Sequence, residues 1–161
     1  MNTFPITKEV LLTFLDKASQ ATYAGGGKEE EHPERSGFVE FTYTEGDLSY
    51  RDSFVGWYRS RGMEVVRYKG KPIWTSMYGG GMVYGKNDLA DTTFAFLKGA
   101  LSSKEKGFES FRGARLFEEG DFKHTYAQEG DALEFSGYEE IFYKGELVFF
   151  HRIMGGIVED K

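Results

Sequence analysis

Cysteine is absent from this chain of 161 residues, which also has only three prolines and three histidines. Without cysteine there can be no disulfide framework, thiolate metal site or cysteine nucleophile, and this suits a reducing compartment. None of the histidines, His32, His124 and His151, has a second histidine two or four residues away, so the sequence presents no metal-binding face. We therefore expect neither a bound metal nor a cofactor.

Long apolar runs and a targeting segment are missing as well. No uncharged apolar stretch approaches the roughly 18 residues that a membrane span needs. The first twenty residues mix charged with apolar side chains and contain no small-residue cleavage site, which is typical of mature protein. We expect a soluble cytoplasmic protein that does not contact a membrane.

The chain also lacks a surplus of basic residues. It has 20 Lys and Arg and 26 Asp and Glu, which give a formal net charge of -6. Binding to a phosphate backbone rests on Lys and Arg that displace counterions. Residues 51–71 hold six basic and two acidic side chains, whereas residues 28–47 hold two basic and seven acidic ones. Such neighbouring stretches more often solvate one another than recognise a ligand, so we expect no nucleic-acid partner.

Aromatic residues are plentiful, at 17% of the chain, and favour pleated sheets whose faces accept large rings. Apolar residues at helical spacing predict one helix over residues 7–22, with Thr7 as its N-cap. A second stripe predicts a helix with Asp88 as its N-cap that reaches Ala100. Four short runs rich in Phe, Tyr, Val and Thr follow each helix and predict strands.

Glycine and proline mark the strand ends. Lys69 and Gly70 suit a tight hairpin turn, because glycine supplies the positive φ of primed turns. Pro72 directly after that turn fits only a strand start or a sheet edge. The glycine cluster at 79–81 has no phosphate-binding order, and we expect a close approach of two backbones there or a bend where the sheet ends.

An internal repeat is indicated by matches in fixed order, since Gly62, Glu64 and the Tyr-Lys-Gly triplet that ends at Gly70 recur 75 residues later. The expected fold is α+β, a single domain over 1–161 made of two fused helix-plus-four-strand units, about 1–86 and 87–161. Hairpin-length connections predict antiparallel pairing, with the helices packed on one face and a pseudo-twofold between the units. How the sheets of the two units join is left open.

Five stretches together carry a resemblance: TYAGGG, EGDLSYRDSFVGW, GMEVVRYKGKPIWTSMYGGGM, FRGARLFEEGDF and GYEEIFYKGELVFFHRIMGGIV. From about Leu11 to Val158 the chain resembles an uncharacterised bacterial family of domains of unknown function, found alone or behind a Cro/repressor-type helix-turn-helix domain. The segment WTSMYGGGM departs from the Gly-Met-Asn-Tyr-Tyr-Gly run towards which relatives tend. The family defines no catalytic residue, and its fused regulators imply a sensing or partner-binding role only by association.

An aromatic cleft is the expected ligand site, because aromatic walls with a few polar groups suit a small molecule. In a protein this rich in aromatics the same rings are more often plain core, which is the alternative. Six residues are the candidates for ligand binding: Arg51, Trp57, Tyr58, Trp74, Tyr78 and Arg152.

Two residues are candidate acid–base groups. Asp52 shares a strand face with several rings, where burial raises a carboxyl pKa and suits a general base; capping a turn or pairing with an arginine is the alternative. His151 and Arg152 lie on a run that is apolar on both faces, which predicts partly buried positions; a satisfied core histidine is the alternative. Glu64 and Glu139 are equivalent in the repeat and are expected at exposed hairpin positions.

The sequence thus predicts a binding or sensor module rather than an enzyme, with a small molecule or a regulator protein as its partner. A homodimer is expected if an edge strand or apolar patch is left uncovered. The alternative is a small acid–base enzyme, a hydrolase or isomerase, whose carboxylate and histidine groups lie in the aromatic cleft.

Overall fold

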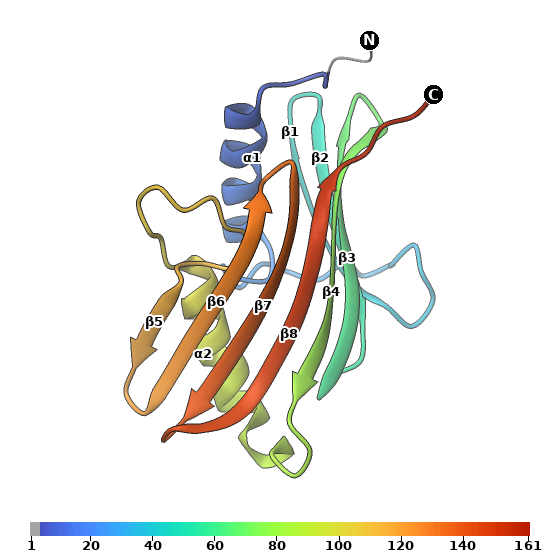
Figure 1. Cartoon of the computed structure of the whole chain (residues 1–161). Coiled ribbons are helices and arrows are strands. Elements are labelled where there is room, and N and C mark those ends of the chain that lie inside the picture. The colour runs from blue at the N-terminus through green and yellow to red at the C-terminus, as the bar shows by residue number, and fades with distance from the viewer. Residues whose placement is uncertain (1–3) are drawn as a thin grey trace.

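The computed structural model describes residues 4–161, and one eight-stranded antiparallel sheet dominates it (Figure 1). The strand order is β1-β2-β3-β4-β8-β7-β6-β5. The strands are β1 (Val39–Glu45), β2 (Leu48–Val55), β3 (Arg59–Tyr68), β4 (Lys71–Met82), β5 (Leu116–Glu119), β6 (Phe122–Asp131), β7 (Glu134–Tyr143) and β8 (Glu146–Ile157). The helices are α1 (Lys8–Ala21) and α2 (Ala90–Ser102), the latter preceded by the 3₁₀ turn η1 (Asn87–Leu89).

The first helix forms as its sequence predicts. The Thr7 hydroxyl accepts a hydrogen bond from the Val10 amide and caps α1, and the apolar stripe of the helix is buried. The expected cap of the second helix is wrong, because Asp88 lies inside η1. Leu89 takes the N-cap position of α2 without a side-chain hydrogen bond. A 3₁₀ turn therefore starts this helix instead of a capping carboxylate.

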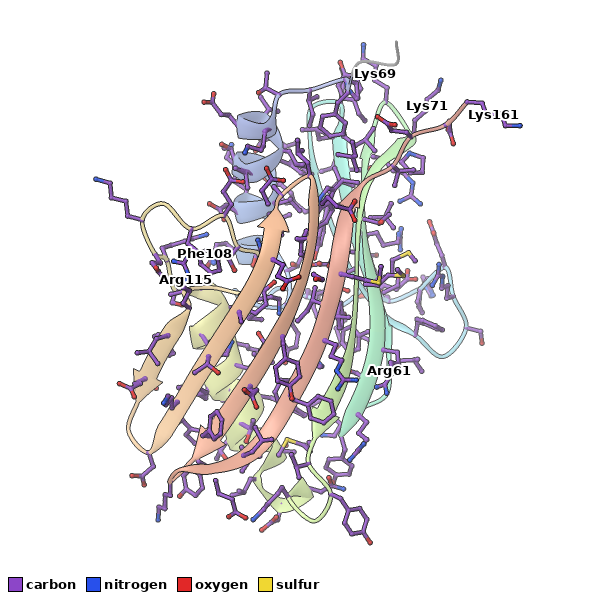
Figure 2. The ribbon with its side chains drawn as sticks, in the orientation of Figure 1. Arg61, Lys69, Lys71, Phe108, Arg115 and Lys161 are labelled. Atoms are coloured by element: carbon purple, nitrogen blue, oxygen red, sulfur yellow. The ribbon has the colours of Figure 1, made fainter. Side chains whose placement is uncertain are left out.

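Two Lys-Gly turns close hairpins of the sheet, as predicted for the first of them. Lys69 and Gly70 have φ of 49° and 82°, and Lys144 and Gly145 have φ of 50° and 80°. Positive φ at both central residues is the geometry of a type I′ turn, which matches the twist of the flanking strands. Lys69 lies at the tip of its hairpin, near the C-terminal end of the chain (Figure 2). Pro72 is the second residue of β4, in agreement with its expected place at a strand start.

Bulges beside these turns change which face the next residues occupy. The register shifts between Val66 and Arg67, and again between Ile141 and Phe142. The partner strands carry one extra residue each, Ile73 and Val148, and both are buried together with the residue that follows them. Strict alternation predicts that Val148 and Phe149 lie on opposite faces of β8. This prediction is wrong, because the bulge interrupts the period of two and both side chains are buried.

The expected α+β class is wrong, and the fold is sheet-dominated. The two 12-residue strands β4 and β8 pair along their length, from Trp74 opposite Ile157 to Met82 opposite Phe149, and so unite all eight strands in one sheet. The glycine cluster at 79–81 makes the close backbone approach that is one of its two expected roles, and β4 runs through it to Met82. A Cβ at Gly80 would lie 2.0 Å from the Phe150 carbonyl oxygen, so only glycine lets β4 and β8 approach there.

The helices, of 14 and 13 residues, do not form a layer over the sheet. The α1 helix contacts β1 and β2, whereas α2 contacts β5 and β6 (Figure 1). Each helix buries its own apolar cluster, one centred on Trp74 and the other on Phe149. The face of the sheet between the two clusters is where the polar groups of the interior gather. The division into repeat units about 1–86 and 87–161 remains a prediction from the sequence.

The β3–β4 turn gives a test of the hairpin geometry. Lys69→Asn should raise the free energy of unfolding by about 0.5 kcal/mol, because asparagine accepts positive φ more readily than lysine. Urea denaturation measures the change. Lys71→Asn, an exposed change at the start of β4, is the control and should give no gain. Equal gains in both variants would contradict the turn assignment.

Candidate functional site

A cavity of about 610 Å³ lies over the middle of the sheet, between the C-terminal end of α1 and the side of α2. Strands β1 to β4 and β8 form its floor, and the chain after α2 closes one end through Phe111 and Arg112. This volume is within the range of ordinary small-molecule sites.

Aromatic rings form two walls of this cavity. On one side Tyr23 meets Phe41 and Phe54 edge-on, with ring centroids 6.2 and 6.3 Å apart. On the other side Trp57 meets Phe94 edge-on at 5.3 Å. Trp57 remains 63% exposed, so part of its ring is available at the mouth. Rings in these positions offer both apolar surface and electron-rich faces to a ligand.

Two acidic side chains lie side by side on the cavity floor. Asp52 of β2 and Glu64 of β3 are cross-strand partners, and both line the cavity. The Tyr78 hydroxyl donates to Asp52 Oδ1 at 2.7 Å, and the Tyr50 hydroxyl donates to Glu64 Oε1 at 2.6 Å. Asp52 is only 5% exposed. Within residues 4–161 neither carboxylate forms an ion pair.

Burial raises the pKa of Asp52 to about 8, and the neighbouring charge of Glu64 adds to this rise. The Tyr78 hydrogen bond and the more distant Arg112 charge oppose the rise without cancelling it. Burial also lifts the pKa of Tyr78 well above its usual value, so its hydroxyl keeps the proton that it donates. The pKa of Asp52 is thus raised, as expected from its place on a strand face among aromatic rings.

Tyr78 reaches Asp52 by crossing an intervening strand at a glycine. A Cβ at Gly62 of β3 would lie 2.4 Å from the Tyr78 ring and 2.8 Å from the Phe54 Cβ. The missing side chain at Gly62 therefore makes room for the hydrogen bond between β4 and β2.

A second cluster of polar side chains surrounds Glu139 of β7. Glu139 is fully buried, so the expected exposed hairpin position is wrong. Arg112 donates to this carboxylate through Nε at 3.1 Å and Nη2 at 2.7 Å, and His124 Nε2 donates at 2.9 Å. Burial alone would raise the pKa of Glu139, but the charge of Arg112 and the bonds from His124 and Arg112 hold it well below its usual range. Glu139 is therefore ionised and paired.

His151 of β8 links this group to the cavity. Arg112 Nη2 donates to His151 Nδ1 at 3.2 Å, and His151 Nε2 lies 3.5 Å from the Ser60 hydroxyl. Burial lowers the pKa of His151, although its contact with Glu139 opposes the change. His151 is thus a neutral, hydrogen-bonded histidine that also lines the cavity.

The structure brings four of the sequence candidates together, since Asp52, Trp57, Tyr78 and His151 all line the cavity. Trp74 is not one of the lining residues. It is fully buried in the core, where its indole nitrogen donates to the Ala132 carbonyl at 2.8 Å.

The two arginine candidates lie away from the cavity. Arg51 forms ion pairs with Glu34 and Glu40, so residues of the basic and acidic stretches pair with one another. Arg152 is exposed rather than partly buried, with its guanidinium 5.9 Å from the Tyr138 ring centre. Strand β8 is central in the sheet, but only one of its faces is covered.

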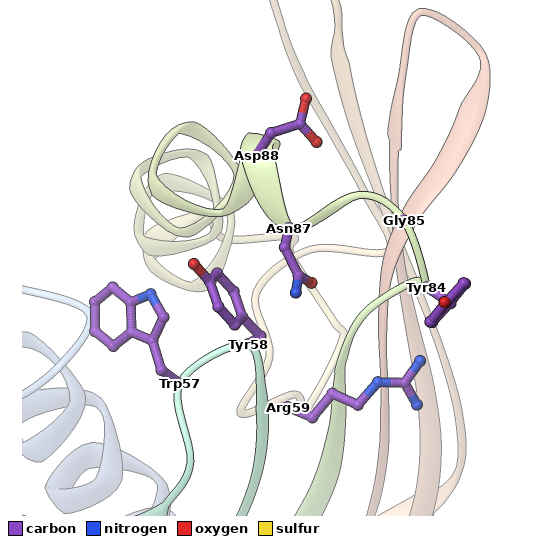
Figure 3. A pocket seen from close by; sticks show the side chains of 7 residues that line it. All are labelled: Trp57, Tyr58, Arg59, Tyr84, Gly85, Asn87 and Asp88. Atoms are coloured by element: carbon purple, nitrogen blue, oxygen red, sulfur yellow. The ribbon is translucent and has the colours of Figure 1, made fainter.

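Tyr58 belongs to a different hollow, which is open to solvent at one end of the sheet (Figure 3). Its lining includes Arg59 and Tyr84, and the latter is 92% exposed. The deeper cavity is the stronger candidate, because its lining includes buried ionisable groups and the open hollow has none.

Sequence reasoning missed several members of the site, among them Tyr50 and Arg112. Tyr50 shares a strand face with Asp52, and this alternation could have placed it beside the acids. Arg112 lies in the irregular stretch between α2 and β5, where no periodicity indicates the direction of a side chain. Only the folded chain places it against Glu139.

Removing the carboxyl group of Asp52 should change how stability depends on pH. The folded pKa, about 8, is above the unfolded value, so the folded state holds more protons and wild-type stability falls as pH rises from about 4 to about 8. Asp52→Asn keeps the shape and removes this loss. The variant should therefore gain on the order of 4 kcal/mol over wild type between about pH 5 and about pH 8, measured by urea denaturation. A difference between the two proteins that does not change with pH would contradict the raised pKa.

No curated protein sequence and no solved structure matches the chain. Among residues 4–161 there is no group of three His, Cys, Asp or Glu placed to hold a metal ion, and neither described helix is long and apolar enough to cross a membrane. One family model matches residues 52–158, which include most of the cavity floor, and on this match the chain belongs to the family of the domain of unknown function DUF5680.

Proposed function

We propose that the chain is a binding module that holds a small molecule in the cavity between the sheet and the helices. The observation that carries this proposal is the pair Asp52 and Glu64, placed on the floor of an aromatic cavity with no ion-pair partner in residues 4–161. Ligand sites combine apolar walls with a few polar groups in this manner. The rings supply contact area, and the acids supply orientation.

Stability alone does not account for the acids. Burial of an ionisable group without a charged partner costs free energy, and an apolar side chain at Asp52 would pack against the same rings without that cost. Glu139, in contrast, is compensated by the charge of Arg112 and by a hydrogen bond from His124. Uncompensated acids that face open space are more consistent with a ligand than with packing.

A sensor role extends this proposal. The resemblance to domains that follow helix-turn-helix regulators supports a partner protein that responds to the occupied cavity. The paired charges of Arg51 with Glu34 and Glu40 support a protein partner over nucleic acid, because they leave less free basic surface.

An acid–base enzyme is the second candidate, and one observation favours it. A carboxyl group whose pKa is about 8 can exchange protons near neutral pH, and Asp52 has this property beside Tyr78 in a cavity. Any turnover that depends on Asp52 should show a pH limb near 8 and disappear in Asp52→Asn. A rate that is unchanged in this variant would contradict the enzymatic role.

A blocked cavity tests the binding proposal. A thermal-shift screen of a metabolite library should find compounds that raise the melting temperature of the wild-type chain. Ala95 is an exposed residue of α2 that lines the cavity, so Ala95→Trp should fill the mouth and abolish these shifts. Thr92→Trp adds the same ring on α2 at an exposed position outside the lining and should preserve them. Shifts that persist in Ala95→Trp, or a screen without any hit, would contradict the proposal.

A further inference from the structure

The charges inside the cavity do not balance. Arg112 is the one buried arginine of the described chain, and its charge is matched by Glu139. His151 is neutral because burial lowers its pKa. Asp52 and Glu64 are left without a cationic partner among residues 4–161, so the floor carries a surplus of negative charge when one of them is ionised.

The two acids also have unused acceptor atoms. Asp52 accepts one hydrogen bond at Oδ1, and Glu64 accepts one at Oε1. Neither Asp52 Oδ2 nor Glu64 Oε2 has a hydrogen-bond partner within the described residues. Asp52 is only 5% exposed and lines the cavity, so a buried acid with an unpartnered oxygen borders the space where a ligand would lie, and this oxygen becomes an acceptor once Asp52 releases its proton.

The aromatic walls suit a cation as well. The ring faces of Tyr23, Phe54 and Trp57 attract positive charge through their quadrupoles. One such contact is already present at the mouth, where Lys98 Nζ lies 4.9 Å from the Tyr23 ring centre. Within residues 4–161 this lysine is the one cation of the cavity lining without an ion pair, and the exposed acids Glu29 and Asp91 in the same lining outnumber it.

We infer that the cavity binds an organic cation, a molecule whose protonated primary or secondary amine lies between Asp52 and Glu64 and whose apolar part lies between the aromatic walls. The inference rests on the proposed function and specifies its ligand. The ammonium group donates hydrogen bonds to Asp52 Oδ2 and Glu64 Oε2, and it supplies the positive charge that the floor lacks.

Two other ligand classes fit less well. An anion would meet Arg112, whose guanidinium is already bonded to Glu139 and His151. A metal ion would have only two carboxylates, since no group of three acidic, histidine or cysteine side chains is placed around a common point in the described residues. An organic cation makes use of both acids and of the rings.

Cation binding should release a proton. The groups that face Asp52 are Glu64 on β3, Tyr78 on β4, Tyr50 on β2, Glu40 on β1 and Arg112 after α2. None of the neighbours that favour its ionised form outweighs burial, so Asp52 holds a proton at neutral pH. A bound ammonium group favours the carboxylate, and the dissociation constant should fall as pH rises towards about 8, by up to about tenfold per pH unit.

Calorimetric titration of the full chain with three probes of similar shape tests the charge preference. The probes are benzylammonium, benzyl alcohol and benzoate, at fixed ionic strength and millimolar concentration. Benzylammonium should bind at least about tenfold more tightly than the other two and release a proton, seen as a dependence of the binding heat on the buffer. Tighter or equal binding of benzyl alcohol or benzoate would overturn the inference and leave the proposed function standing.

Matched variants separate the acid pair from general electrostatics. Asp52→Asn should remove both the preference for benzylammonium and its pH dependence, and Glu64→Gln should reduce the preference. Asp47→Asn removes the same charge from the β1–β2 turn, outside the cavity, and should change neither. Failure of benzylammonium to bind overturns the inference, and the library screen then decides the proposed function separately. A preference that survives both cavity variants would also overturn the inference.

Discussion

The ion pair between Arg112 and Glu139 determines the electrostatics of the interior. Arg112 comes from the irregular chain after α2, and its bonds to Glu139 attach that chain to the middle of the sheet. Both partners are buried, so the pair is stable only with the additional bonds from His124 and to His151. Glu139 neutralises the buried positive charge of Arg112. Within residues 4–161 no other buried cation pairs with Asp52 or its neighbour on β3, so a ligand or a shared proton would have to compensate their charge.

The shape of the cavity follows from a mismatch between sheet and helices. Pairing of β4 with β8 gives one sheet of eight strands, whereas the two helices make most of their contacts at opposite edges, α1 with β1 and β2 and α2 with β5 and β6. The cavity lies between the helices over β1 to β4 and β8, and rings from α2, β1 and β2 line it. A sheet wider than its helical cover leaves interior space, and the polar groups of this chain face that space.

The sequence predicts those features that depend on local patterns. Thr7 and the helical stripe after it specify α1, and the period of two places Asp52 among rings, where its pKa rises. Non-local features escape such reasoning. The pairing of β4 with β8 depends on close approach at Gly80, the inward direction of Val148 depends on a bulge, and Arg112 lies in a segment without periodicity. The pairing of β4 with β8 explains why the predicted fold class is wrong. The lack of periodicity around Arg112 explains why the sequence does not place this residue beside Glu139.

The central claim is that Asp52 is a buried acid without a compensating charge. A carbon-13 NMR titration of its side-chain carboxyl group, assigned by comparison with Asp52→Asn, measures this directly. The account predicts a midpoint near 8, with the Glu139 signal still that of an ionised carboxylate at the lowest pH at which the chain stays folded. A midpoint for Asp52 near the ordinary value of about 4 would contradict the account, because the carboxyl group would then be either solvated or paired.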